Sequence, residues 1–257
     1  MTNDPRLIAF KKLLDIMDEL RAKCPWDKKQ TFDSLRYLTI EETYELSDAI
    51  LEKSIDEIPK ELGDLMLHIV FYAKLGSEEK SFDITDVLNG VNEKLIRRHP
   101  HIFSDVKVNN EEDVRNNWEL IKLKEGNKSV LGGVPNSLPA MVKAYRIQEK
   151  AHGVGFDWEE SRLAWEKVEE EIQEFKVELD AGSSRKEDEF GDLLFALVNY
   201  ARLENINPED ALEKTNKRFI RRFQYMEQCA REMNCQLSDL NLEEMEVLWQ
   251  KAKAAGV

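Results

Sequence analysis

The amino-acid sequence predicts an all-α fold made of two similar helical units. Apolar residues recur every three or four positions through most of the chain, which is the spacing of a helix with one buried face. Residues that favour turns are scarce, because the 11 Gly and 7 Pro make up about 7% of the 257 residues, where roughly 12% is usual. No convincing stretch alternates between apolar and polar residues as a half-buried strand would. We therefore expect helices and few turns.

The apolar stripes place each helix in order along the chain. The first stripe covers residues 5–21. Further stripes predict helices over 33–53, 56–75, 84–98, 111–124, 138–151, 159–180, 185–204, 208–233 and 242–254. The helix over 208–233 also has a start signal, since Asn207 suits the N-cap and Pro208 suits the first turn.

The two halves of the chain resemble each other. Ile40–Glu45 corresponds to Glu169–Glu174, and Glu61–Asp64 corresponds to Glu189–Asp192. Further matches follow in the same order, with offsets between 124 and 131 residues. Two copies indicate a tandem duplication rather than a solenoid, which needs three or more repeats.

A stretch rich in Gly, Pro, Ser and Asn separates the two copies, which is the composition of an interdomain linker. We therefore predict an N-terminal unit over 1–125, a linker over 126–139 and a C-terminal unit over 140–257.

The composition excludes several classes of function. The net charge of −14 disfavours nucleic acid as a partner, because an acidic chain repels phosphate backbones. An anionic substrate would need a local cation, such as a metal ion. No stretch approaches 18 uninterrupted apolar residues, so no membrane span is expected. The three Cys lack paired spacing and no signal peptide is evident, which together predict a cytoplasmic protein with reduced thiols.

Each unit carries four acids in the same arrangement. One predicted helix holds Glu at positions i and i+3, and the next helix holds Glu and Asp at i and i+3, so each pair shares a helix face. These residues are Glu42, Glu45, Glu61 and Asp64 in the first unit and Glu171, Glu174, Glu189 and Asp192 in the second. A short connection makes the two helices antiparallel neighbours, which brings the carboxylates together. Four clustered anions are tolerable around a hard cation, and oxygen ligands favour Mg²⁺ or Mn²⁺ over Zn²⁺.

One acidic pair alone would be an ordinary solvated helix face. The recurrence of all four acids in both units favours the metal sites. Gly63 and Gly191 stand beside the Asp of each set, where a missing side chain permits close helix approach or access for a metal.

Basic residues follow the acids in each unit. Lys94 with Arg98, and Arg218 with Arg222, are cation pairs four residues apart, which are slightly unfavourable unless they face an anion. Ion pairing to surface acids is the simpler alternative for either pair. Lys167 lies one helical turn before the acids of the second unit and could reach a metal-bound phosphate.

Three further features bear on phosphate and nucleotide binding. The position of the first unit that corresponds to Lys167 is Leu38. Trp249 could stack on a base, although packing in the core is an equal alternative. No P-loop is present to bind phosphates instead.

These residues resemble the MazG family of nucleoside triphosphate pyrophosphohydrolases. The pattern Glu-Glu-x-x-Glu, then about 15 residues, then Glu-x-x-Asp is the signature of that family. Other segments resemble its full-length form with two units: Cys24–Thr31, Asn92–His101, Gly155–Trp158 and Arg221–Phe223. The resemblance implies an all-α fold, Mg²⁺ dependence, cleavage of NTPs to NMP and pyrophosphate, and a homodimer that completes the helical bundle.

The resemblance also gives roles to individual residues. Glu171, Glu174, Glu189 and Asp192 would hold Mg²⁺, and Glu170 would act as general base or orient the attacking water. Lys167, Lys186, Arg218 and Arg222 would offset charge on the phosphates. The acids and basic pair of the first unit would be the equivalents there, and the Lys167–Leu38 difference predicts that the second unit carries most of the activity.

Two other functions remain open at this stage. A regulator that binds nucleotides without turnover would keep the same fold. A relative of narrow specificity, such as a dUTP or phosphoribosyl-ATP pyrophosphohydrolase, would share the helical architecture, although the layout with two units disfavours it.

Overall fold

The computed structural model describes residues 3–108, 110, 114, 117–118, 121 and 129–257. The described residues form helices and contain no β-strand, which confirms the all-α prediction. Of the helix predicted over 111–124, only residues 114, 117–118 and 121 are described, and these are helical. Among the helices of the described ranges, none is both long and apolar enough to cross a membrane.

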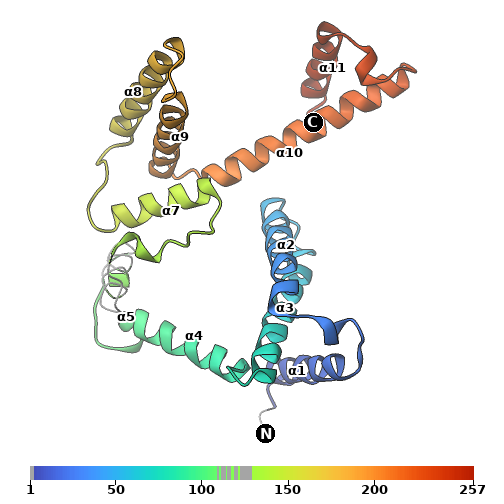
Figure 1. Cartoon of the computed structure of the whole chain (residues 1–257), viewed down its shortest axis with the longest axis vertical. Coiled ribbons are helices and arrows are strands. Elements are labelled where there is room, and N and C mark those ends of the chain that lie inside the picture. The colour runs from blue at the N-terminus through green and yellow to red at the C-terminus, as the bar shows by residue number, and fades with distance from the viewer. Residues whose placement is uncertain (1–2, 109, 111–113, 115–116, 119–120, 122–128) are drawn as a thin grey trace. The chain divides into compact units, whose positions relative to one another are not determined.

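Two compact units make up the chain, over Met1–Asn109 and Asn110–Val257. The first unit contains α1 (Pro5–Lys23), α2 (Phe32–Leu51), α3 (Ile58–Glu78), α4 (Ile84–Arg98) and the short α5 (Pro100–Phe103), as Figure 1 shows. The second unit contains α7 (Ala140–His152), α8 (Ser161–Asp180), α9 (Lys186–Leu203), α10 (Pro208–Glu232) and α11 (Leu242–Ala254). Short 3-10 helices connect some of them: η1 (Asp27–Lys29), η2 (Leu131–Gly133) and η3 (Leu237–Asp239).

The predicted linker over 126–139 begins outside the described residues, at 126–128. From residue 129 it continues through η2 to the start of α7. The division at 125 and 140 stays a prediction.

The core of the first unit lies where α1, α2 and α3 meet. Met17, Leu35, Val70 and Phe71 are almost completely buried there. A capping box starts α2, because Thr31 and Ser34 exchange side-chain and backbone hydrogen bonds of 2.9–3.2 Å. α2 and α3 then run side by side, and this pairing places the acids of the first unit.

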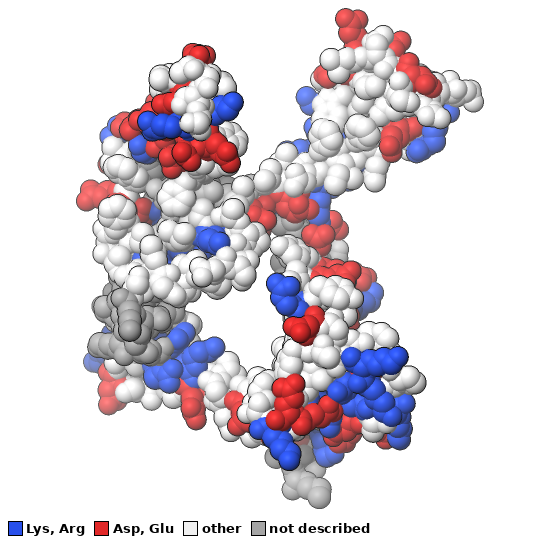
Figure 2. All heavy atoms as spheres, in the orientation of Figure 1, with Lys and Arg blue, Asp and Glu red and all other residues white. Residues whose placement is uncertain are grey.

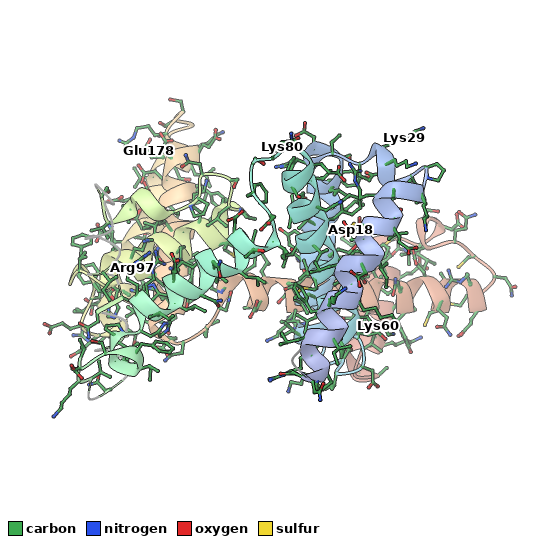
Figure 3. The ribbon with its side chains drawn as sticks, turned by 90° about the horizontal axis from the view of Figure 1, so that it is seen from below. Asp18, Lys29, Lys60, Lys80, Arg97 and Glu178 are labelled. Carbon is green, nitrogen blue, oxygen red and sulfur yellow. The ribbon has the colours of Figure 1, made fainter. Side chains whose placement is uncertain are left out.

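The helix α3 is the longest element of the first unit. Figure 3 shows Lys60 and Lys80 at its opposite ends. Gly76 lies near its C-terminal end and packs against the ring of Phe82, since a Cβ at Gly76 would come within 2.7 Å of that ring. The close contact fixes the chain where it turns from α3 toward α4.

The second unit centres on the packing of α8 against α9. Ala164 and Val168 of α8 are fully buried, as is Val198 of α9. Gln148 joins α7 to this pair, because its side-chain amide donates a hydrogen bond of 2.8 Å to the carbonyl oxygen of Phe195. α10 begins as predicted, with Asn207 accepting hydrogen bonds from the next backbone N–H groups.

Candidate metal centre

The structure brings the acids of the first unit together at the α2–α3 pair. Glu42 and Glu45 of α2 and Glu61 of α3 each offer a carboxylate oxygen, and these oxygens lie within 4.8 Å of one another. Asp64 follows Glu61 by one turn of α3 and lies close enough to raise the pKa of Glu42. We call these four acids the first cluster.

The α8–α9 pair repeats this arrangement in the second unit. Glu171 and Glu174 of α8 and Glu189 of α9 offer oxygens within 4.8 Å of one another. Asp192 follows Glu189 by one turn, is exposed and lies outside this group of three acids. Figure 2 shows acidic side chains gathered over one end of the α8–α9 pair. We call these four acids the second cluster.

Mutual repulsion is visible in the pKa values of both clusters. Burial and the neighbouring Asp64, Glu45 and Glu41 raise the pKa of Glu42. Burial and nearby carboxylates also raise the pKa of Glu61 and of Glu174, with Lys167 partly opposing the shift at Glu174. Carboxylates that resist ionisation because of their neighbours are the electrostatic setting that a cation relieves.

The second cluster differs from the first in burial and in its basic neighbours. Glu171 is 6% exposed and Glu189 is 5% exposed, whereas the acids of the first cluster are half-buried or exposed. Lys167 Nζ lies 2.8 Å from Glu171 Oε1 and 2.7 Å from Glu170 Oε1. Hydrogen bonds to Glu170 and then Glu171 raise the pKa of Lys167, so this side chain is protonated.

A second cation reaches the buried Glu189. Arg185 Nη2 lies 2.5 Å from Glu189 Oε1, and Arg185 Nη1 lies 3.7 Å from Glu178 Oε1. Its neighbour Lys186, which begins α9 and is exposed, was predicted to contact phosphate, and that role stays a prediction. The spacing of four residues between Arg185 and Glu189 is the signal that would have identified this contact.

One buried oxygen of the second cluster lacks a partner. Glu171 Oε2 is inaccessible to solvent and has no hydrogen-bond partner among the described residues. An unpaired buried carboxylate oxygen is costly, since it has lost water without gaining a donor. Its position among Glu174 and Glu189 fits a divalent cation with oxygen ligands.

The predicted phosphate-binding residues of α10 make other contacts. Arg222 Nε donates a hydrogen bond of 2.7 Å to the carbonyl oxygen of Val257, and the guanidinium lies 5.5 Å from the centre of the Trp249 ring. Trp249 also packs against Phe219, with ring centres 5.1 Å apart. Arg218 donates to Thr215 on its own helix. Within one chain, Arg222 and Trp249 thus join α10 to α11, and their contact with phosphate stays a prediction.

The basic residues of the first unit lie on α4. Lys94 is exposed on this helix, and Arg98 is its last residue. α4 contacts α3, the helix that carries Glu61 and Asp64. The proximity of these two basic residues to a bound phosphate also stays a prediction.

The glycines beside the acids do not serve close packing within the chain. A Cβ at Gly63 or at Gly191 would meet nothing within 4 Å. Of the two predicted roles, close helix approach is therefore absent between described residues, and access for a metal stays a prediction. Open space remains beside each cluster.

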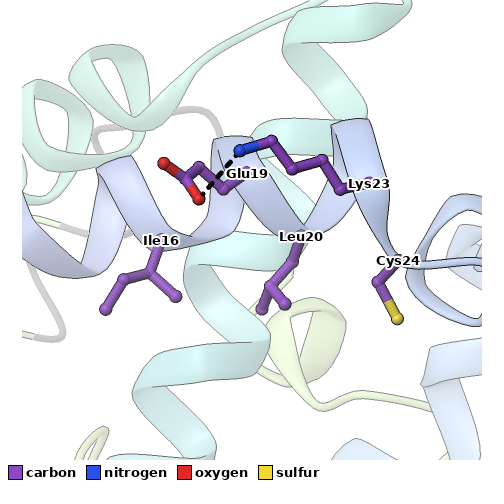
Figure 4. Close-up of a pocket in the computed structure, with 5 residues that line it drawn as sticks. All are labelled: Ile16, Glu19, Leu20, Lys23 and Cys24. Carbon is purple, nitrogen blue, oxygen red and sulfur yellow. Dashed lines mark hydrogen bonds and ion pairs between the residues drawn. The ribbon is translucent and has the colours of Figure 1, made fainter.

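A hollow of about 320 Å³ lies along α1, and none of the acids of the first cluster lines it; Figure 4 shows the residues that do. Its lining is Ile16, Glu19, Leu20, Lys23 and Cys24. The lining contains a single acid, Glu19, and this acid pairs with Lys23 at 3.2 Å. The hollow therefore lacks the set of free carboxylates that a metal would need.

Comparisons with known proteins match both halves of the chain. The family model of the MazG nucleotide pyrophosphohydrolase domain matches residues 30–103, which include the first cluster. A Thermotoga maritima protein described as a nucleoside triphosphate pyrophosphohydrolase/pyrophosphatase MazG is 43% identical over 251 residues, covering 96% of each chain. An Escherichia coli K12 protein described as a nucleoside triphosphate pyrophosphohydrolase is 42% identical over 252 residues, covering 94% of this chain and 96% of its own.

A solved structure was also found, described as a mazG-related protein from Thermotoga maritima. It shares 25% identity with a TM-score of 0.40, and the match covers 44% of this chain and 98% of that one.

Proposed function

The chain belongs to the MazG family of nucleoside triphosphate pyrophosphohydrolases, and on this premise we propose that it cleaves NTPs and dNTPs between the α- and β-phosphates. The products are a nucleoside monophosphate and pyrophosphate. The observation that carries the proposal is the unpaired, buried Glu171 Oε2 among the carboxylates of α8 and α9. A bound cation would give this oxygen a partner, and the same cation would attract the negatively charged triphosphate to the acids.

The proposed cofactor is Mg²⁺, with Mn²⁺ as an alternative. Glu171, Glu174, Glu189 and Asp192 would hold it in the second cluster, and the equivalent acids would hold it in the first. All the side chains are carboxylates, which suit both hard cations. When bound, the cation supplies a Lewis acid for the phosphate oxygens and for the attacking water.

The proposed reaction needs a base and positive charge near the α-phosphate. Glu170 is exposed beside the cluster and can accept a proton from water that attacks the α-phosphorus. Lys167 holds Glu170 at 2.7 Å and presents its charge at the same place, where it can offset charge that develops on the phosphate oxygens. Arg185 reaches Glu189 from the other helix and adds a second positive charge.

We assign most of the turnover to the second unit. Lys167 has no basic counterpart in the first unit, because Leu38 occupies that position and packs against the core of Met17 and Leu35. The first unit thus keeps the acids but lacks this cation.

A homodimer completes the proposal. Leu62, Met66 and Ile69 form an exposed apolar stripe along α3, with 51%, 41% and 44% of their surfaces accessible. The second unit repeats the stripe at Phe190, Leu194 and Leu197, which are 48%, 43% and 39% exposed. Exposed apolar stripes at the same register of both repeats favour coverage by a second copy. Neither nucleic acid nor a membrane is a proposed partner.

The proposal is tested by measuring pyrophosphate release from each NTP and dNTP, with Mg²⁺ and with a chelator. We expect release that requires the cation and is lost in the Asp192→Ala variant. A Glu93→Ala variant, which removes an exposed acid of α4, controls for the change in net charge. Binding without release would indicate a nucleotide-binding regulator, and release from a single nucleotide would indicate the narrow specificity described above.

A further inference from the structure

The two buried acids of the second cluster already have protein cations. One oxygen of Glu171 is held by Lys167 at 2.8 Å, and one oxygen of Glu189 is held by Arg185 at 2.5 Å. Both carboxylates belong to the group that could hold a metal ion. The two basic side chains thus take up ligand oxygens and part of the negative charge that would attract a cation.

The first cluster has no such arrangement. The position equivalent to Lys167 is Leu38, a core residue. The position equivalent to Arg185 is Glu57, an acid whose carboxylate is paired with Lys60 at 2.7 Å. Among the described residues, no ion pair joins a basic side chain to Glu42, Glu45, Glu61 or Asp64, whereas Lys167 and Arg185 each hold a buried acid of the second cluster.

From this difference we propose that the two clusters take their cations in different ways. The first cluster binds a free divalent cation by itself. The second cluster is closed to a free cation by Lys167 and Arg185 and binds one only together with the phosphates of a nucleotide, which draw both basic side chains away from Glu171 and Glu189. The second part rests on the proposed function, since it needs a triphosphate at this site.

Electrostatics at these distances make the difference measurable. A cation that enters the second cluster would lie close to two positive charges, and unit charges about 4 Å apart near a protein surface interact strongly enough to change an affinity by more than ten-fold. Exchange of the basic side chains onto phosphate removes this repulsion and supplies Arg and Lys with anionic partners of suitable geometry. The catalytic unit would thus be loaded with its cation only when substrate is present.

The experiment measures binding of Mn²⁺ alone to the full-length chain, by the loss of the free Mn²⁺ signal in electron paramagnetic resonance. One variant, Glu171→Gln with Glu174→Gln, leaves the first cluster intact. Its counterpart, Glu42→Gln with Glu45→Gln, leaves the second cluster intact. We expect the chain with an intact first cluster to bind Mn²⁺ at least about ten-fold more tightly. Equal affinities, or a tighter second cluster, would overturn the proposal.

A second set of variants tests the cause and does not depend on the carboxylate changes. Lys167→Met is made in the chain with an intact second cluster. It should raise the affinity of this chain for free Mn²⁺ about ten-fold, because it removes a positive charge that repels the cation. Lys176→Met removes an exposed lysine of the same helix and should leave the affinity unchanged. No gain from Lys167→Met, or an equal gain from Lys176→Met, would show that Lys167 does not compete with the cation.

Failure of this inference is distinguishable from failure of the proposed function. Mn²⁺ binding is measured without nucleotide, so the order of the two affinities does not depend on any reaction. If the affinities are equal while NMP and pyrophosphate are released, the loading order is wrong and the activity stands. The coupling to phosphate is tested by adding a non-hydrolysable triphosphate analogue. The analogue should strengthen Mn²⁺ binding at the second cluster by more than its own binding of Mn²⁺ explains. If it does not, the coupling to phosphate is wrong even where the two affinities differ as expected.

Discussion

Lys167 and Glu171 form a close ion pair one turn apart on α8, with 2.8 Å between Nζ and Oε1, while the other oxygen of Glu171 is buried without a partner. One oxygen of this carboxylate is therefore paired with a protein cation, and the other has no partner. This relationship places a fixed positive charge beside the acids of the second unit, and the first unit has no equivalent.

Replacement of Lys167 should reduce turnover more than it reduces stability. Lys167→Met removes a cation that faces the proposed phosphate position, and loss of such an electrostatic contact costs about 10²–10³ in kcat. Lys167 is 37% exposed but its partner Glu171 is only 8% exposed, so the variant should also melt at a somewhat lower temperature, and kcat is compared at a temperature where both proteins are folded. Steady-state kinetics measure the effect. If Lys167→Met and the control Lys176→Met have the same kcat, Lys167 is an ordinary surface lysine.

Paired substitutions identify the unit that carries most of the NTP hydrolysis. Glu171→Ala with Glu174→Ala should remove most NTP hydrolysis, because it removes two proposed cation ligands from the cluster that has Lys167. Glu42→Ala with Glu45→Ala should leave most of the activity. Circular dichroism checks that both variants fold. A reversed pattern would assign catalysis to the first unit, and equal losses would make the two units equivalent.

Removal of one acid from the first cluster should stabilise the protein when no metal is present. Burial and neighbouring carboxylates raise the pKa of Glu42 above its ordinary value of 4.5. A carboxyl whose pKa is higher in the folded state favours folding at low pH, and this contribution is lost as the pH rises through the folded-state pKa. In a chelator at pH 7, Glu42→Gln should therefore melt at a higher temperature than the wild type.

The pH dependence and the effect of metal check that explanation. The advantage of Glu42→Gln should shrink as the pH falls through the raised folded-state pKa of Glu42 and should be lost below 4.5, where the wild-type carboxyl is protonated in both states. Saturating Mg²⁺ should reverse its sign, because the variant lacks a ligand. A lower melting temperature for Glu42→Gln at pH 7 in chelator would contradict repulsion within the cluster, and Glu93→Gln on α4 is the control.

The exposed stripe on α3 should be needed for dimer formation. Leu62→Asp places a charge at a position that we propose a second copy covers, and burial of an unpaired charge at an interface is strongly unfavourable. Light scattering after size exclusion should show a dimer for the wild type and a monomer for the variant. Ile55→Asp makes the same change at a residue that is 71% exposed outside the stripe. A wild-type monomer, or equal dissociation of both variants, would contradict the proposed interface.

The sequence was sufficient for the helices and for the convergence of three of the four predicted acids in each unit. Helical periodicity located α1, α2 and α10 to within a few residues, and the spacing of three residues on neighbouring helices brought Glu171 and Glu189 together. Both results follow from helix periodicity and from short connections between helices, and both of these can be seen in the sequence.

The partners of the long basic side chains could not be predicted in the same way. Arg222 donates to the carbonyl oxygen of Val257 and lies over Trp249, contacts that its spacing from Arg218 did not indicate, and its contact with phosphate stays a prediction. Arg185, which pairs with Glu189, was not among the predicted site residues, and the predicted phosphate contact of Lys186 stays a prediction. A flexible side chain can reach many groups, and its choice depends on tertiary packing that periodicity does not describe.

The position of bond cleavage tests the central claim most directly. ATP is incubated with the protein and Mg²⁺ in ¹⁸O-labelled water, and the masses of the separated products are measured by mass spectrometry. Attack at the α-phosphorus predicts AMP that carries one ¹⁸O and pyrophosphate that carries none. Formation of ADP and phosphate, or ¹⁸O in the pyrophosphate, would contradict the proposed hydrolysis.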